Sequence, residues 1–286
     1  MPVATAPVRV CDAGGWTDTW FARAGVVCNL AVRPGVRVEV SERDGDEVTF
    51  AEPPTPLLEA AVAEAGAIGV HITVSAAVPA GSSLGTSAAV TVALLAALGV
   101  PHLELASRAH RVETERLGLQ SGVQDQVAAA DGGASLLEID YPNVRRRALE
   151  VPAVPDLLTV FLGAHRSSAV HERVIAEATS DSAALDALRS CARDAAAALE
   201  AGDLRAYGAA LIANTDAQRA LHPSLVSEQA QAVIDAARAS GALGWKVNGA
   251  GGEGGSVTVV CGGARPNLPG QVLPLRYSAQ GVIVTG

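Results

Sequence analysis

A run of small residues from Pro79 to Ala89 has the composition of an anion-binding loop: Pro-Ala-Gly-Ser-Ser-Leu-Gly-Thr-Ser-Ala-Ala. It follows an alternating strand pattern and precedes an apolar helix pattern. Small side chains let the backbone approach a ligand closely, and the unpaired N–H groups at a helix start favour negative charge. The run therefore predicts a polyphosphate-binding loop, although a flexible turn before a core helix would have the same composition. It is not a Walker A loop, because no Gly-Lys-Ser/Thr closes it.

The same loop contains Gly81-Ser82-Ser83-Leu84-Gly85, which also fits the nucleophile elbow of a serine hydrolase. Asp125 and either His165 or His222 follow in the order of a hydrolase triad. Against this reading, no HGGG-type oxyanion segment is present, and the regular strand–helix alternation of a doubly wound sheet is missing. The hydrolase reading also leaves two further glycine motifs without a role.

Those two glycine motifs lie near the ends of the chain. Residues 9–19 read Arg-Val-Cys-Asp-Ala-Gly-Gly-Trp-Thr-Asp-Thr, and residues 246–255 read Lys-Val-Asn-Gly-Ala-Gly-Gly-Glu-Gly-Gly. The second contains GxGxxG, but it leads into a strand pattern rather than a helix. No Asp or Glu follows Glu253 to hold a ribose, so a dinucleotide-binding fold is not indicated.

Taken together and in this order, the three motifs resemble those of the GHMP kinases, named for galactokinase, homoserine kinase, mevalonate kinase and phosphomevalonate kinase. The segments AGGWTDT and Gly122-Val-Gln-Asp-Gln126 are most similar to the L-fucokinase and D-glycero-D-manno-heptose 7-phosphate kinase branch. The resemblance implies an α+β fold of two domains. Residues 1–153 would form a domain like ribosomal protein S5 domain 2, and residues 154–286 a ferredoxin-like domain.

The resemblance also implies the reaction. A kinase of this branch transfers the γ-phosphoryl group of ATP, with Mg²⁺, to a sugar hydroxyl, and the branch acts on the anomeric oxygen. Asp125 would accept the acceptor's proton or orient its oxygen, and Arg9 would hold that carboxylate ionised. Asp18 would bind sugar hydroxyls, although a turn aspartate after two glycines is the alternative. The other expected substrate-binding residues are Gly15, Trp16, Thr17 and Gln124.

The nucleotide and the metal ion are assigned in the same way. Glu113 and Ser87 would bind Mg²⁺ through hard oxygen atoms, with Glu115 as the alternative glutamate. Without the resemblance, Glu113 could be a solvated residue paired with Arg116. The expected ATP-binding residues are Pro79, Gly81, Ser82, Ser83, Leu84, Gly85, Thr86, Ser87, Gly249, Gly251 and Gly252.

Three residues depart from the family pattern. Ser83 stands where the second motif usually has glycine, Glu253 interrupts the third, and Cys11 replaces a common aspartate in the first. Glu253 would repel phosphates unless it points away, whereas Cys11 could be a small core residue. These departures keep open a catalytically weak protein that binds nucleotide or sugar.

The acceptor is not determined by these motifs. Fucose, another hexose, a uronic acid and a heptose 7-phosphate all remain open. A distal phosphate would need a cation, and the candidates are Arg23, His165, Arg166 and Arg173.

The elements that must position these residues can be predicted from periodicity. Alternation predicts strands over 36–40 and 48–50 joined as a hairpin at Asp44-Gly45, and another strand over 70–74. Helices are expected over 57–65, 87–98, 103–117 and 227–240, with a nearly continuous helical region over 171–222. Strands are expected over 151–163, 245–247 and 257–261.

Composition sets outer limits on function. The formal charge of −9 argues against a general nucleic-acid binder. The four cysteines show no zinc spacing and are typical of a reduced, cytoplasmic protein. Neither a signal peptide nor a membrane span is expected. The resemblance implies a small sugar or sugar phosphate as the partner, and neither a nucleic acid nor a membrane.

Overall fold

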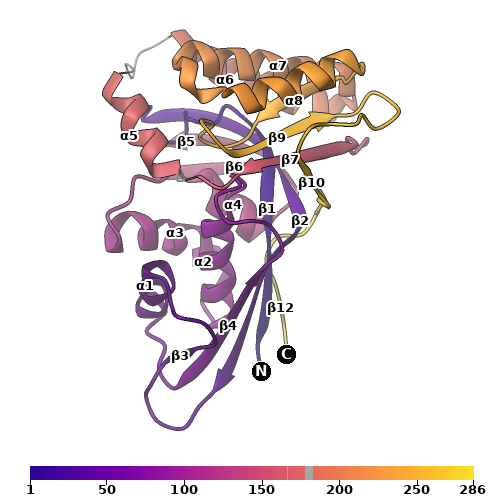
Figure 1. The fold of residues 1–286 in the computed structure, drawn as a ribbon. Coiled ribbons are helices and arrows are strands. Elements are labelled where there is room, and N and C mark those ends of the chain that lie inside the picture. Colours follow the sequence, from indigo (N-terminus) through magenta and orange to yellow (C-terminus); the bar gives the residue numbers. More distant parts are fainter. Residues whose placement is uncertain (166, 178–182) are drawn as a thin grey trace.

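The computed structural model describes residues 1–165, 167–177 and 183–286. Figure 1 shows two layers of structure. A large twisted sheet with helices on one face rises from the lower end of the view, and part of it reaches the level of a small sheet that is covered by helices. Both chain ends lie at the lower end of the large sheet.

The large sheet has eight strands, and a single long strand organises it. This strand, β2, pairs antiparallel with β1, β4, β5 and β11 along different parts of its length. Valine, leucine and alanine side chains on its inner face enter the main core. The strands are β1 (Val3–Ala13), β2 (Ala24–Glu42), β3 (Thr49–Phe50), β4 (Val70–Ala76), β5 (Ala134–Asp140), β6 (Asn143–Leu149), β11 (Arg276–Tyr277) and β12 (Ile283–Thr285).

The helices beside this sheet carry most of the candidate site. The central helix, α2, is apolar around almost its whole circumference, and it is buried between the sheet and its helical neighbours. The chain then passes through α3 into a π-helical turn, a local irregularity that often occurs at functional sites. The helices are α1 (Pro56–Ala65), α2 (Thr86–Ala97), α3 (His102–Arg111), the π-helical turn Val112–Arg116 and α4 (Gln124–Asp131).

The upper layer is built on a four-stranded sheet in the order β10-β7-β9-β8. Figure 1 shows α6, α7 and α8 above it. Its members are β7 (Leu157–Gly163), α5 (Ser167–Glu177), α6 (Ala183–Ala201), α7 (Leu204–Leu221), the 3-10 turn Pro223–Leu225, α8 (Glu228–Ala239), β8 (Gly244–Val247), β9 (Gly255–Val260) and β10 (Gln271–Leu273).

The two layers share a core. Ala192, Ala195 and Leu199 of α6 belong to the same buried cluster as the inner residues of β1 and β2. The expected domain boundary at residues 153–154 falls between β6 and β7. The last strands, β11 and β12, return to the large sheet, where β12 pairs with the first residues of β1. We therefore propose that residues 276–285 belong with the N-terminal domain.

The α+β fold class is confirmed, and the helices predicted over 57–65, 87–98 and 227–240 are present with shifts of at most one residue at either end. The strand predicted over 36–40 is only part of β2, and the strand predicted over 151–163 begins at Leu157. The predicted hairpin over 36–50 is wrong: β3 pairs in parallel with β4, because β4 already occupies the edge of β2 opposite residues 36–42. The helical region is divided into α5, α6 and α7. The β5–β6 hairpin and α4 had no counterpart among the predicted elements.

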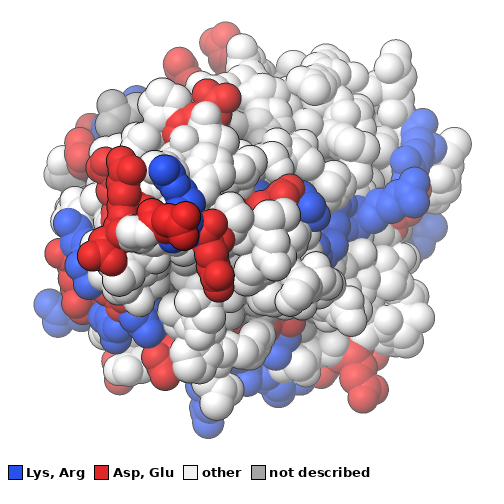
Figure 2. All heavy atoms as spheres, turned by 90° about the horizontal axis from the view of Figure 1, so that it is seen from below, with Lys and Arg blue, Asp and Glu red and all other residues white. Residues whose placement is uncertain are grey.

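Charges of both signs are distributed over the surface. On the face in Figure 2, acidic and basic side chains are interspersed at one side, and basic side chains form a row at the other. Some are paired in clusters, as where Glu64 contacts Arg108, Arg111 and Arg116. Among the described residues, no helix combines the length and the apolar character that crossing a membrane would require.

Candidate active site

A cavity of about 350 Å³ lies where the three glycine motifs meet. Its walls come from the turn after β1, the loop before α2, the segment from the π-helical turn to α4, and the loop after β8. The predicted residues that line it are Arg9, Trp16, Asp18, Gly81, Ser82, Ser83, Leu84, Gly85, Thr86, Ser87, Glu113, Gln124, Asp125 and Gly249.

The loop before α2 has the geometry of an anion cradle. Gly81, Ser83 and Gly85 all have positive φ, at 70°, 60° and 74°, so the chain curls around the start of the helix. Gly85 is the N-cap residue of α2, and no side chain caps the helix there. Ser82 Oγ and Thr86 Oγ1 are buried without a hydrogen-bond partner. The loop therefore presents unused polar groups at a helix N-terminus, which fits a polyphosphate.

Asp125 lies in the first turn of α4 and contacts Arg9 of β1. Arg9 donates from Nε to Oδ1 at 2.8 Å and from a terminal nitrogen to Oδ2 at 3.3 Å. Burial alone would lower the pKa of Arg9, but the nearby carboxylates of Asp125 and Asp12 outweigh it and raise that pKa. Gly85 makes room for this pair, because a Cβ there would lie 2.9 Å from Asp125 Cγ. The carboxylate is thus fixed against the loop.

Asp18 lies on the turn between β1 and β2, where it is buried and lines the cavity. Its Oδ2 accepts the backbone N–H of Gln124 at 3.4 Å. Burial, and secondly the charge of Asp125, raise the pKa of Asp18 to about 6. Gly122 packs directly on this carboxylate, since a Cβ there would lie 2.1 Å from Oδ2. Asp18 is therefore a second carboxylate that faces the same space as Asp125.

Glu113 and Ser87 are brought together, as predicted for the metal site. Glu113 is 5% exposed, and its carboxylate accepts from Ser121 Oγ at 2.6 Å and from Gln126 Nε2 at 2.7 Å. Burial raises the pKa of Glu113, while the hydrogen bonds from Ser121, Ser87 and Gln126 oppose that rise. Glu115 is exposed. A carboxylate and a hydroxyl beside a phosphate cradle fit Mg²⁺, which takes its other ligands from phosphates and waters.

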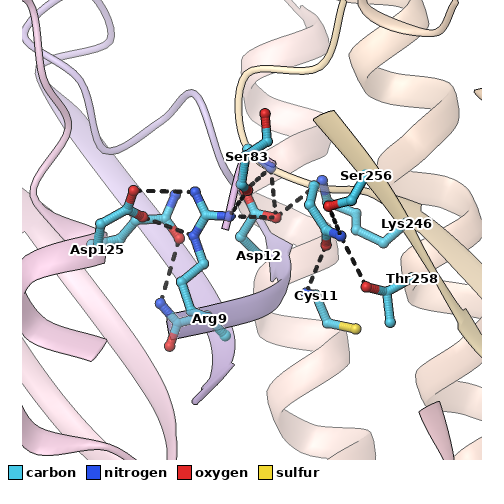
Figure 3. A network of polar contacts seen from close by, with 12 residues as sticks. Arg9, Cys11, Asp12, Ser83, Asp125, Lys246, Ser256 and Thr258 are labelled. Atoms are coloured by element: carbon cyan, nitrogen blue, oxygen red, sulfur yellow. Dashed lines mark hydrogen bonds and ion pairs between the residues drawn. The ribbon is translucent and has the colours of Figure 1, made fainter. Parts of the chain in front are cut away.

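The third motif is attached to the first and second by buried hydrogen bonds (Figure 3). Asn248 accepts from Cys11 N and donates to Ser256 Oγ and Thr258 Oγ1. Ser256 in turn donates to Ser82 O at 2.7 Å. The structure thereby fixes the relative positions of the loop before α2 and the loop after β8.

Two of the three departures from the family pattern, Cys11 and Glu253, have structural explanations. Cys11 is fully buried, and burial raises the pKa of its thiol to about 12, as expected for an inert core residue. Glu253 is exposed and does not line the cavity.

Five predicted residues do not line the cavity: Gly15, Thr17, Pro79, Gly251 and Gly252. Thr17 is buried, and its hydroxyl contacts Gly14 O and Val26 O. Gly252 donates its backbone N–H to Leu225 O at 3.0 Å. These side chains and backbone groups support the turns that carry the lining residues.

Two histidines from the upper layer also line the cavity. His165 follows β7, and its Nε2 lies 2.5 Å from Ser83 Oγ. His171 of α5 stacks edge-on against Trp16 with the ring centroids 4.8 Å apart. Burial lowers the pKa of both imidazoles. His171 was not predicted as a site residue, because it lies in a helical region without a motif.

The predicted hydrolase triad is only partly assembled. Ser83 and His165 are in contact, but Asp125 binds Arg9, and His165 Nδ1 is buried without a partner. His222 instead contacts Glu177 at 2.9 Å. A serine nucleophile would therefore lack the acid that orients its base.

The other lining residues were not predicted from motifs: Thr19, Leu119, Gln120, Ser121, Gly122 and Ala250. Four of them, residues 119–122, come shortly before α4, and their position next to Gln124-Asp125-Gln126 could have indicated them. Thr19 and Ala250 lie within the first and third glycine motifs. Of the candidates for binding a distal phosphate, His165 lines the cavity, whereas Arg23 and Arg173 are exposed and lie outside its wall. Arg166 lies outside the described residues.

Comparisons with known proteins agree with this geometry. Residues 56–133 match the family model "GHMP kinases N terminal domain". A mevalonate kinase from Methanothermobacter thermautotrophicus is 30% identical over 206 residues, which are 68% of this chain and 65% of that relative. The alignment thus spans just under two thirds of the relative's length.

Solved structures of low sequence identity share the fold. A D-glycero-D-manno-heptose 1-phosphate kinase from Bacteriodes thetaiotaomicron has a TM-score of 0.75 at 20% identity, over 100% of this chain and 99% of that one. A galactokinase from Lactococcus lactis, complexed with galactose, has a TM-score of 0.72 at 15% identity, over 98% and 94%. Residues 56–133 thus match a domain of the GHMP kinases, and the whole chain shares its fold with these solved structures.

Proposed function

We propose that this protein is a sugar kinase that transfers the γ-phosphoryl group of ATP to a sugar hydroxyl, with Mg²⁺ as the metal ion. The observation that carries the proposal is the arrangement of Asp125. Its carboxylate is held by Arg9 at 2.8 Å, beside the start of α2 and facing the same cavity as Asp18. The Asp125 carboxylate thus lies between the loop before α2, which would bind phosphate, and the Asp18 carboxylate, which would bind the sugar.

Different residues would bind the nucleotide, bind the metal ion and assist the transfer. Backbone N–H groups of the loop before α2 would hold the polyphosphate, and Glu113 with Ser87 would hold Mg²⁺. ATP supplies the phosphoryl group, and Mg²⁺ neutralises phosphate charge. Asp125 would accept the proton of the attacking hydroxyl or orient its oxygen. Arg9 would hold the Asp125 carboxylate in place and offset charge that develops during transfer.

The acceptor would be held by Asp18. An ionised Asp18 can accept hydrogen bonds from two sugar hydroxyls, and Gln124 and Trp16 complete this end of the cavity. The anomeric hydroxyl is the proposed acceptor, because it is the most acidic hydroxyl of a sugar. A single carboxylate therefore suffices as its base.

A screen for ADP release, run with ATP and Mg²⁺ across free sugars and sugar phosphates, tests the proposal. We expect acceptor-dependent ADP release with at least one neutral or phosphorylated sugar. If the protein binds ATP but forms no ADP with any of the acceptors, a nucleotide or sugar sensor would be favoured instead.

A second function is favoured by one specific contact. The 2.5 Å approach of Ser83 Oγ to His165 Nε2 is the geometry of a serine–histidine dyad. A fluorophosphonate would label Ser83 in a hydrolase, and labelling that requires His165 would support that function. We expect no labelling, because the dyad lacks an orienting carboxylate.

A further inference from the structure

Lys246 is the only lysine of the chain, and it is fully buried on β8. Its Nζ lies 3.0 Å from Gln218 Oε1 and 3.5 Å from Asp12 Oδ1, and it also donates to Val247 O. Burial lowers the pKa of Lys246, and the Asp12 charge opposes that effect. A buried ammonium group is costly unless a charge and hydrogen bonds compensate it. The catalytic role proposed above makes no use of this lysine.

Asp12 is equally buried and lies between two cations. Besides Lys246, it faces a terminal nitrogen of Arg9 at 4.0 Å. It also accepts the backbone N–H of Gly249 at 3.1 Å and 3.0 Å. Figure 3 shows the resulting row of alternating charge, in which Lys246, Asp12, Arg9 and Asp125 follow one another from β8 to α4.

This row gives Arg9 two competing anionic partners. Arg9 Nε lies 2.8 Å from Asp125 Oδ1, and a terminal nitrogen of Arg9 lies 4.0 Å from Asp12 Oδ1. Asp12 is fully buried, whereas Asp125 is 26% exposed. The charge of Asp12 therefore acts on the guanidinium of Arg9 with less screening by solvent. Lys246 offsets the charge of Asp12 and so weakens its pull on Arg9. Without Lys246, Asp12 would draw Arg9 away from Asp125.

We propose that Lys246 is a positioning residue for the phosphoryl transfer proposed above. By offsetting the charge of Asp12, it keeps the Arg9 guanidinium hydrogen-bonded to the Asp125 carboxylate. The inference rests on the proposed function only for its effect on the rate. Through Gly249, the same aspartate also connects the third glycine motif to this row. Lys246 does not line the cavity, so its effect on Asp125 would pass through Asp12 and Arg9. Lys246 also contacts Gln218, which donates to Gly249 O, and Asp12→Asn in the test below separates the two routes.

The test compares Lys246→Met with a double variant that also carries Asp12→Asn. Lys246→Met removes the cation while keeping a similar shape, and we expect kcat to fall by about 10-fold or more, because small displacements of a catalytic group have effects of this size. The KM for ATP should change much less. Adding Asp12→Asn should restore most of the lost kcat, because asparagine no longer attracts Arg9 but can still accept the Gly249 N–H.

A purely structural role for Lys246 predicts the opposite pattern. The double variant would then be at least as inactive as Lys246→Met, and that result would overturn the proposal. Thr215→Val is the matched control. It removes a buried hydroxyl that contacts Leu211 O and Trp245 O next to β8, outside the charge row. We expect it to lower the melting temperature without the loss of kcat.

An NMR measurement makes the test independent of activity. The Nε–H signal of Arg9 reports its hydrogen bond to Asp125, and we expect it to shift in Lys246→Met and to return in the double variant. An unchanged signal in Lys246→Met would overturn the proposal, even if no acceptor is ever found. If Lys246→Met does not fold, Lys246→Gln, which can still hydrogen-bond Gln218, is read in the same way.

Discussion

Arg9 and Asp125 are 116 residues apart in the chain, yet their side chains form a two-point contact, with Nε of the arginine 2.8 Å from Oδ1 of the aspartate. The contact joins β1 to the first turn of α4. It leaves Asp125 26% exposed, and Asp125 lines the cavity. The carboxylate is therefore held in place and still accessible to an acceptor.

Asp125→Asn should lower kcat by about 100-fold or more, which is the usual size of a general-base contribution. The amide keeps the shape of the side chain but loses its charge and basicity. ATP binding, measured by calorimetry, should remain largely intact, because the loop before α2 is unchanged. Activity within a few fold of the parent protein would remove Asp125 from the mechanism.

Glu113→Gln should raise the Mg²⁺ concentration needed for half-maximal activity, because a neutral amide binds a hard dication more weakly than a carboxylate. Glu115→Gln is the matched control, since Glu115 is exposed two residues away. A magnesium titration of both variants decides between the two glutamates. A shift in Glu115→Gln alone would show that the wrong one was chosen.

Ser83→Ala should leave most of the kinase activity, because the cradle binds through backbone N–H groups. The variant loses the contact with His165 but keeps a Cβ at a φ of 60°. Steady-state kinetics with ATP as the varied substrate measure the effect. An inactive Ser83→Ala protein that still binds ATP would contradict the cradle and revive a direct role for the hydroxyl.

The acceptor's kcat/KM should decrease as the pH falls through about 6. Burial raises the pKa of Asp18 to about 6, so this carboxylate gains a proton below that pH and then accepts fewer hydrogen bonds from sugar hydroxyls. Below this value kcat/KM should fall about 10-fold per pH unit. Asp18→Asn should lower kcat/KM at neutral pH and lose this acidic limb, whereas an identical limb in the variant would assign it to another group.

The product should be a sugar 1-phosphate. An anomeric hydroxyl is acidic enough for a single carboxylate to act as its base, and Asp18 would hold hydroxyls away from the reacting carbon. Phosphorus–proton coupling in the NMR spectrum of the product identifies the phosphorylated position. A phosphate on a primary hydroxyl would overturn the proposed branch while leaving a kinase of the same superfamily.

The sequence alone determined those features that depend on local chemistry. The loop from Pro79 to Ser87 is recognisable because small residues and a helix start are both encoded within a few positions. The pattern of Ala, Val and Leu likewise predicted α2 to within one residue at each end. The order of the three motifs pointed to the superfamily.

Only the tertiary structure decided which side chains meet. The charge row joins β1, α4 and β8, and the contact of Ser83 with His165 joins the two layers. Such pairs depend on how the two layers pack against each other through their shared core, which no local pattern specifies. Asp12 and Lys246 lie in the first and third glycine motifs, but nothing in the sequence indicated that they contact each other. Lys246 and Asp12 are both fully buried, and they form an ion pair because a charge removed from water is costly unless an opposite charge compensates it.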